Sequence, residues 1–137
     1  MNNVVSDNAT SQDAALGAGM YVCSRSSPTL LHNTIARNKG KDGSGIYVDE
    51  WYGDYSSIAM TNTIISGQTV GIMVTMGNTA TLESTLWHDN TSNWAGAGVI
   101  NHSDDHNGDP KFAFDGYHLS LGSAAIDKGA DAGVAVD

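Results

Sequence analysis

A glycine-containing phrase recurs four times along the chain at nearly constant spacing. It reads Gly-Ser-Gly-Ile-Tyr-Val at residues 43–48, and similar phrases occupy residues 17–22, 69–74 and 96–101. The glycine before the apolar triplet falls at Gly19, Gly45, Gly71 and Gly98, in steps of 26, 26 and 27 residues. A period in this range is typical of stacked structural repeats.

A second phrase alternates with the first. Residues 31–35, 60–64 and 82–86 resemble one another, and residues 3–5 resemble the end of an earlier copy. Each unit therefore holds two short apolar runs of period two, separated by Gly, Asn, Ser and Asp, and no run has helical spacing. Strands that return to the same place after about 26 residues become parallel neighbours only if the chain coils.

The sequence thus predicts an all-β fold, a parallel β-helix solenoid of about four coils. The side chains expected inside it are Met20, Val22, Leu31, Ile35, Ile46, Val48, Met60, Ile64, Ile72, Val74, Leu82, Leu86 and Val99. Asn33, Asn62 and Ser84 are predicted to form a polar ladder at a bend, because short polar side chains bond backbone groups that leave the strands. Thr34, Thr63 and Thr85 are expected to form a column facing outward.

These phrases resemble the repeats of the right-handed parallel β-helix superfamily of pectate-lyase-like proteins, which read much like Asn-x-Ile-x-x-Asn followed by Gly-Ile-Tyr. The last third, with Asp109-Pro110-x-Phe112, Tyr117-His118-Leu119 and residues 122–129, resembles the tail of bacterial surface and secreted proteins with a choice-of-anchor domain. The resemblance implies coils over residues 1–108 and an extended segment over residues 109–137 that flanks or caps the last coil. It also implies an extracellular or cell-surface location for a longer parent protein, but no single activity.

Composition and charge narrow the choice of partners. A net charge of −9, with only 6 Lys and Arg residues, argues against nucleic acid, because few phosphates could be neutralised. No apolar run of about 18 residues predicts a membrane span. Cys23 is the single cysteine, so no internal disulfide can form.

Self-association is expected through one of two surfaces. The chain begins within a coil, and an uncapped solenoid end displays unpaired strand groups that a second copy can cover. The outward residues of the first phrase, Tyr21, Tyr47, Met73 and Ile100, are predicted to form an apolar stripe, and exposed apolar stripes usually mark contacts. The sequence therefore predicts a homo-oligomer.

An insertion after the second copy of the first phrase concentrates aromatic and acidic residues. It contains Asp49, Glu50, Trp51, Tyr52 and Tyr55. Aromatic faces beside carboxylates suit sugar rings, whose C–H faces stack while their hydroxyl groups bond the acids. The alternative is a loop that folds back over the side of the solenoid.

Titratable residues cluster near the last coil. His88, Asp89, His102 and His106 are the candidate catalytic residues, since imidazole and carboxylate groups together can act as acid and base. Asp104, Asp105 and Asp109 are the candidate ligands for Ca²⁺, which prefers carboxylate oxygens on irregular loops. A solvated acidic loop is the alternative to both.

The sequence contains no nucleophile elbow, phosphate loop, dinucleotide fingerprint or paired-cysteine zinc motif. The first hypothesis is therefore an extracellular module that binds polysaccharide or mediates surface interactions without catalysis. The second is a carbohydrate-active lyase or hydrolase, with an ester hydrolase as a weaker version. A self-assembling piece of a surface protein is the third.

Overall fold

The computed structural model describes residues 1–11, 16–40, 42 and 44–133. Gly43, the first residue of the organising phrase, lies outside these ranges. All regular elements of the described residues are short β-strands, and every neighbouring pair is parallel. The chain winds as a solenoid of about four coils, as predicted, and no helix in the described part is long and apolar enough to cross a membrane.

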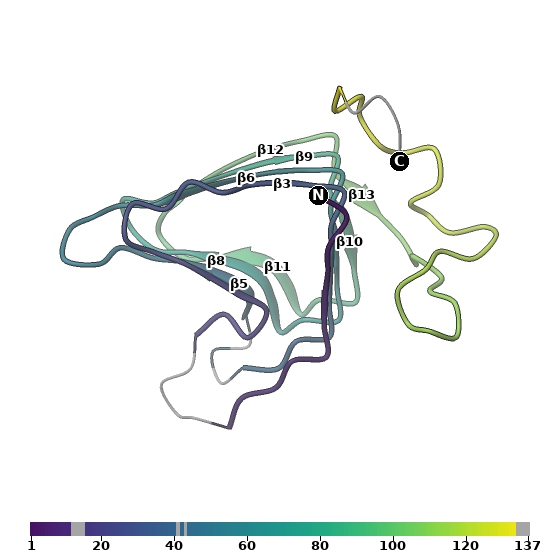
Figure 1. Cartoon of the computed structure of the whole chain (residues 1–137), viewed down its shortest axis with the longest axis horizontal. Coiled ribbons are helices and arrows are strands. Elements are labelled where there is room, and N and C mark those ends of the chain that lie inside the picture. The colour runs from purple at the N-terminus through teal and green to yellow at the C-terminus, as the bar shows by residue number, and fades with distance from the viewer. Residues whose placement is uncertain (12–15, 41, 43, 134–137) are drawn as a thin grey trace.

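Three parallel sheets form the walls of the solenoid (Figure 1). Sheet 1 contains β1 (Val4–Ser6), β4 (Thr34–Ala36), β7 (Ile64–Ser66), β10 (Leu86–His88) and β13 (His106–Asn107). Sheet 2 contains β2 (Met20–Val22), β5 (Ser44–Val48), β8 (Val70–Val74) and β11 (Ser92–Ala95). Sheet 3 contains β3 (Thr29–Leu31), β6 (Ser57–Thr61), β9 (Thr79–Glu83) and β12 (Val99–Ser103).

A coil therefore has three strands rather than the two short runs that the sequence predicts. The second phrase is divided by a bend, so that its first half ends a strand of sheet 3 and its second half begins a strand of sheet 1. The bend residues are His32, Asn62, Ser84 and Asp104, all with φ between 51° and 55°. This left-handed conformation is most accessible to asparagine, aspartate and histidine among non-glycine residues, which fits three of these four positions.

The prediction that residues 96–101 form a fourth copy of the first phrase is wrong. In sheet 2, Ile46 pairs with Ile72, and Ile72 pairs with Trp94, so the last step is 22 residues and not 27. Residues 99–101 instead belong to β12, where Ile100 pairs with Ala80 in sheet 3. Shorter links in the later coils cause this shift, since a solenoid fixes the strands while its connecting links vary in length.

The core is a column of aliphatic layers in which each coil stacks on the next. The members of this core, among them Ile46, Val48, Ile72 and Val74, have 3% or less of their surface exposed. Trp87 stacks on Ile65 as its neighbour on the next coil. Most of the predicted interior is confirmed: Val22, Ile35, Ile46, Val48, Met60, Ile72, Val74 and Leu82 are buried in the core, and Met20 is partly buried against it.

Four of the predicted interior residues point outward. Leu31 pairs with Thr61, and Ile64 pairs with Thr34 and Leu86, which places all three out of phase with the core side chains of their strands. Leu86 is buried, but on the outer face of sheet 1, which the C-terminal segment covers. Val99 pairs with Thr79 and is 54% exposed. The errors at Leu31, Ile64 and Leu86 come from a one-residue slip in aligning the second phrase, because a slip of one residue along a strand exchanges the two faces. The error at Val99 comes from assigning residues 96–101 to the first phrase, since Val99 lies in sheet 3.

The same slip affects the polar columns. Asn33 aligns with Thr63 and Thr85, not with Asn62 and Ser84, and only its bond from the Asn3 side chain (Nδ2 to Oδ1, 3.0 Å) links asparagines at this corner. Thr63 and Thr85 are buried, so the predicted outward threonine column is also wrong.

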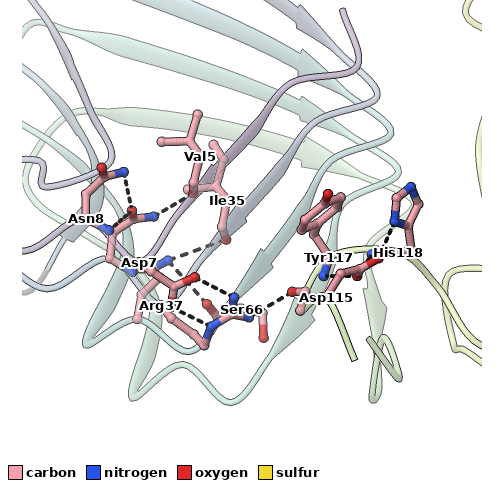
Figure 2. A network of polar contacts seen from close by, with 12 residues as sticks. Val5, Asp7, Asn8, Ile35, Arg37, Ser66, Asp115, Tyr117 and His118 are labelled. Atoms are coloured by element: carbon pink, nitrogen blue, oxygen red, sulfur yellow. Dashed lines mark hydrogen bonds and ion pairs between the residues drawn. The ribbon is translucent and has the colours of Figure 1, made fainter. Parts of the chain in front are cut away.

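A polar ladder does occur at the other end of sheet 1. The side-chain oxygens of Asn38, Gln68 and Asn90 accept hydrogen bonds from the backbone N–H groups of Asn8, Asn38 and Gln68, respectively, at 2.9–3.2 Å. Figure 2 shows its first step at Asn8. Asn38 and Gln68 are buried, so the ladder satisfies backbone groups that leave sheet 1 without access to water.

The segment that follows β13 lies outside sheet 1, beyond β10 and β13, rather than across the end of the last coil (Figure 1). It contains a small hairpin in which Phe112 and Leu119 form an antiparallel bridge. Arg37 ties this hairpin to the solenoid: its side chain makes a double ion pair with Asp7 at 2.7 and 2.8 Å and donates to the Gly116 carbonyl at 3.1 Å (Figure 2). The guanidinium also lies 5.8 Å from the centre of the Phe112 ring.

Candidate functional site

The aromatic insertion connects β5 to β6 and projects from the corner between sheets 2 and 3 (Figure 1). Trp51, Tyr52 and Tyr55 are 55%, 91% and 58% exposed, so the loop does not fold back to hide its rings. The Trp51 and Tyr52 rings meet edge to face with centroids 5.4 Å apart. Together with Asp49 and Glu50 they line a hollow of about 430 Å³.

The base of this loop is fixed by Asp49. One carboxylate oxygen accepts from the Thr75 hydroxyl at 2.7 Å and from the Glu50 N–H at 2.9 Å, and the other accepts from the Tyr21 hydroxyl at 3.1 Å. These bonds join three successive coils at one carboxylate. Burial, followed by the bond to Asp49, raises the pKa of Tyr21 to about 12.

The tip of the loop is closed by its own contacts. Trp51 and Asp54 exchange backbone hydrogen bonds at 3.0 and 3.4 Å across a turn that contains Tyr52 and Gly53. Arg25, which follows β2 in an earlier coil, forms an ion pair with Asp54 at 2.6 Å. The exposed rings are therefore carried by a loop with a closed, braced backbone, which lowers the entropy cost of binding a ligand.

Tyr55 owes its position to a glycine on the next coil. A Cβ atom at Gly77 would lie 2.2 Å from the Tyr55 ring, and the φ of Gly77 is 83°. Any larger residue at position 77 would therefore displace this ring and strain the turn.

The predicted apolar stripe is real only in part. Tyr21, Tyr47 and Met73 stack along sheet 2, and the two tyrosine rings are parallel-displaced with centroids 5.8 Å apart. Their fourth member is Ala95, because Ile100 lies in sheet 3. The stripe contacts the aromatic loop at one point, where the Tyr21 hydroxyl donates a hydrogen bond to Asp49 at the base of the loop.

The structure brings together only some of the candidate catalytic residues. His102 Nδ1 lies 2.7 Å from a carboxylate oxygen of Asp105, and the His102 ring packs 4.7 Å from the Trp94 ring. His88 Nε2 lies 3.8 Å from Asp109. Asp89 and Asp104 are exposed residues of the bends, with φ of 50° and 52°.

His106 lies away from both pairs, on the face of sheet 1 that the C-terminal segment covers. Its Nε2 lies 3.1 Å from the Lys128 carbonyl oxygen. The four candidate catalytic residues therefore do not form one cluster. The single histidine–carboxylate contact of hydrogen-bonding length in this region pairs one of them with Asp105, a candidate metal ligand.

Asp104, Asp105 and Asp109 do not gather around a common point. In the part of the chain that the structure describes, no group of three or more His, Cys, Asp or Glu side chains is arranged to hold a metal ion. The geometry of the described residues therefore gives no support to the predicted Ca²⁺ site.

Sequence reasoning did not find the residues that brace the aromatic loop. Tyr21 and Arg25 lie on the coil before residues 49–54, and Thr75 lies on the coil after them, so their proximity to the loop depends on the coil alignment. A second histidine–carboxylate pair, His118 with Asp115 at 2.5 Å in the C-terminal hairpin, was also missed. Hydrogen bonds from the backbone and side chain of His118 lower the pKa of Asp115 to about 2.

The family follows from a comparison with protein-family models. Residues 1–87, more than half of the chain, match the model described as "Right handed beta helix region". The chain belongs to this right-handed β-helix family. No curated protein and no solved structure matches it. The family match covers β1 to β9 and most of β10 and includes the aromatic loop, but it ends before the C-terminal segment, so the choice-of-anchor resemblance of that segment stays a prediction.

Proposed function

We propose that this β-helix protein is a carbohydrate-binding module without catalysis of its own, and that the loop of residues 49–55 holds the sugar. The observation that carries the proposal is the pairing of two exposed rings, Trp51 and Tyr52, with a carboxylate whose position is fixed by three hydrogen bonds. Solvent-exposed aromatic rings next to fixed acceptors match the alternating apolar and hydroxyl faces of a sugar.

We also propose that the protein acts at the cell surface or outside the cell. In that setting the ligand is a polysaccharide. The acidic surface, with a net charge of −9, favours a neutral glycan over a polyanionic one, because like charges repel unless a cation bridges them.

A glycan array followed by calorimetric titration tests this function. We expect binding of a neutral glycan, with an approximately fivefold loss of affinity for Trp51→Ala and for Tyr52→Ala, since an aromatic stacking contact contributes about 1 kcal/mol. Phe114→Ala is the matched control, because Phe114 is a fully exposed aromatic residue on the distant C-terminal hairpin. The proposal fails if no glycan binds, or if the loop variants bind as tightly as the Phe114 variant.

A second candidate function is a carbohydrate-active lyase or hydrolase, and the specific observation that favours it is the His102–Asp105 contact at 2.7 Å. A carboxylate that orients an imidazole is the arrangement used by general acid–base catalysts. Turnover of polyuronides, neutral glycans and simple esters, with and without chelator, measures this activity. We expect His102→Gln to abolish any turnover, and turnover unchanged by this substitution would exclude the dyad.

We further propose that the open ends of the solenoid mediate self-association, with the first coil of one copy stacked on the last coil of another. Each end exposes part of the inward-facing column of sheet 2: Met20 is only partly buried at one end, and Trp94 is 37% exposed at the other. Among the strands that the structure describes, β1, β2 and β3 at one end and β13, β11 and β12 at the other have a neighbouring strand on one side only, and such edges can pair with another chain. Sedimentation at increasing concentration tests this, and a monomer at all concentrations would contradict it.

A further inference from the structure

A groove runs between the bend that joins sheets 3 and 1 and the C-terminal segment. Its volume is about 370 Å³, within the range of roughly 300–1,000 Å³ that is usual for small-molecule sites. One wall consists of stacked bend residues, among them His32, Asn33, Asn62 and Thr63, and the other consists of residues 119–130. We call it the corner groove. Among its lining residues, the sequence predicts a functional role only for His106, as a candidate catalytic residue.

The second wall is held in place by two defined contacts. The Asn62 side chain brackets Ala130: Nδ2 donates to its carbonyl at 2.8 Å, and Oδ1 accepts from its N–H at 2.7 Å. His106 Nε2 donates to the Lys128 carbonyl at 3.1 Å, because a carbonyl oxygen can only accept. Hydrogen bonds thus fix the second wall of the groove against the solenoid.

The charge of the groove is opposite to that of the chain. The chain carries 15 acidic and 6 basic residues, yet none of the described Asp or Glu residues lines the groove. His32, His106 and Lys128 do. Among the residues that the structure describes, the Lys128 ammonium has no ion-pair partner.

The lining also holds hydrogen-bonding atoms that no protein group satisfies. Asn33 Nδ2, Thr63 Oγ1 and His32 Nε2 are buried atoms without a partner in the described structure, and Asn33 and Thr63 are only 4% and 1% exposed. An amide nitrogen only donates, whereas a hydroxyl group and an imidazole nitrogen can donate or accept. Buried polar atoms normally have a partner, so this side of the groove has unused hydrogen-bonding groups that can serve as donors.

We infer that the corner groove binds a small organic anion, one that presents a carboxylate or phosphate group to Lys128 and further oxygen acceptors to the stacked bend residues. A hollow that contains the Lys128 ammonium and unused hydrogen-bonding groups, in an otherwise acidic protein, selects against cations and neutral apolar ligands. This site is independent of the proposed sugar-binding loop, since the two share no residue.

Titrations followed by amide chemical shifts test the inference. The probes are citrate, inorganic phosphate and, as the neutral control, glycerol. We expect citrate, phosphate or both to cause saturable shifts at Asn62, Lys128 and Ala130 that glycerol does not cause. The stronger of the two anions identifies whether carboxylate or phosphate chemistry is preferred.

A matched pair of variants separates a site from general attraction to charge. Lys128→Met and Lys111→Met remove the same charge, but Lys111 does not line the groove. We expect Lys128→Met to weaken anion binding about two- to fivefold and Lys111→Met to leave it unchanged, with both variants folded by their amide spectra. Equal effects of the two substitutions, shifts spread over the whole surface, or no saturable shift with either anion would overturn the inference, whatever the result of the glycan experiments.

Discussion

The Tyr21 hydroxyl occupies an environment that disfavours its ionised form. It is partly buried against Tyr47 and donates to the Asp49 carboxylate, so a phenolate there would lose hydration and face a negative charge. The same contact orients the carboxylate at the base of the aromatic loop. The titration of this tyrosine therefore reports on the geometry of the proposed sugar site.

An absorbance titration of the phenolic groups measures this directly. We expect Tyr21 to ionise at a pKa of about 12, and Asp49→Asn to lower that value by removing the charge. Because the folded pKa is raised above the ordinary value of 10.0, the contact stabilises the fold fully below pH 10 and loses this effect as the pH rises toward 12. Tyr21→Phe, as a control, should remove the high transition, and a Tyr21 that ionises near 10 would contradict the contact.

Single residues also show where sequence reasoning stops. The types of the buried residues were largely predictable, since Ile46, Ile72 and Val74 follow from period two alone. The bend at Asn62 was recognisable as polar, but its left-handed φ of 55° and the one-residue offset of Asn33 were not. Such offsets depend on which backbone groups pair across coils, and this information is not local to the sequence.

At the scale of elements, the Asn8–Asn38–Gln68–Asn90 ladder holds successive coils together where the chain leaves sheet 1. Gln68 is the central residue of this ladder: its side chain accepts a hydrogen bond from the Asn38 N–H at 3.1 Å and donates one to the Ser66 carbonyl at 3.2 Å. Asn38 and Gln68 are each 2% exposed. Water therefore cannot replace the lost partner if the side chain is removed.

Replacing Gln68 by alanine should destabilise the protein by about 2 kcal/mol, because a buried backbone N–H is left without an acceptor. Asn8→Ala is the matched control at the exposed start of the ladder, with an expected loss of about 0.5 kcal/mol. Urea unfolding measures both values. Equal losses for the two variants would show that the ladder has no special role in the interior.

The C-terminal hairpin is an element whose attachment depends largely on Arg37. Its contacts with Asp7, Gly116 and Phe112 join the first coil, the second coil and the hairpin, and the bond from Arg37 lowers the pKa of Asp7. The ion pair is partly solvent-exposed, with 36% and 58% of the two side chains accessible, so its contribution is modest.

Arg37→Met should loosen the hairpin without unfolding the coils. We expect hydrogen exchange at the Ala113 N–H, which donates to the His118 carbonyl at 2.7 Å, to become about five- to tenfold faster, equivalent to about 1 kcal/mol. Arg25→Met breaks an ion pair elsewhere and serves as the control. Unchanged exchange at Ala113 in the Arg37 variant would mean that other contacts hold the hairpin.

For the whole molecule, the repeated phrases were sufficient to predict the solenoid, but not its coil lengths. The step between ladder residues is 30 residues from Asn38 to Gln68 and 22 from Gln68 to Asn90, and the constant period of the glycine phrase concealed this change. The aromatic loop was predicted from its composition, whereas its bracing by Tyr21 and Thr75 and the corner groove required the coils to be stacked in the correct order.

The alignment of the coils is the claim on which all these sites depend, and nuclear Overhauser contacts between backbone protons of adjacent coils test it most directly. The structure predicts that Ile72 lies beside both Ile46 and Trp94, as a parallel neighbour in sheet 2. Contacts from Ile72 to Val99 or Ile100 in place of Trp94, or antiparallel contacts between β5 and β8, would contradict it.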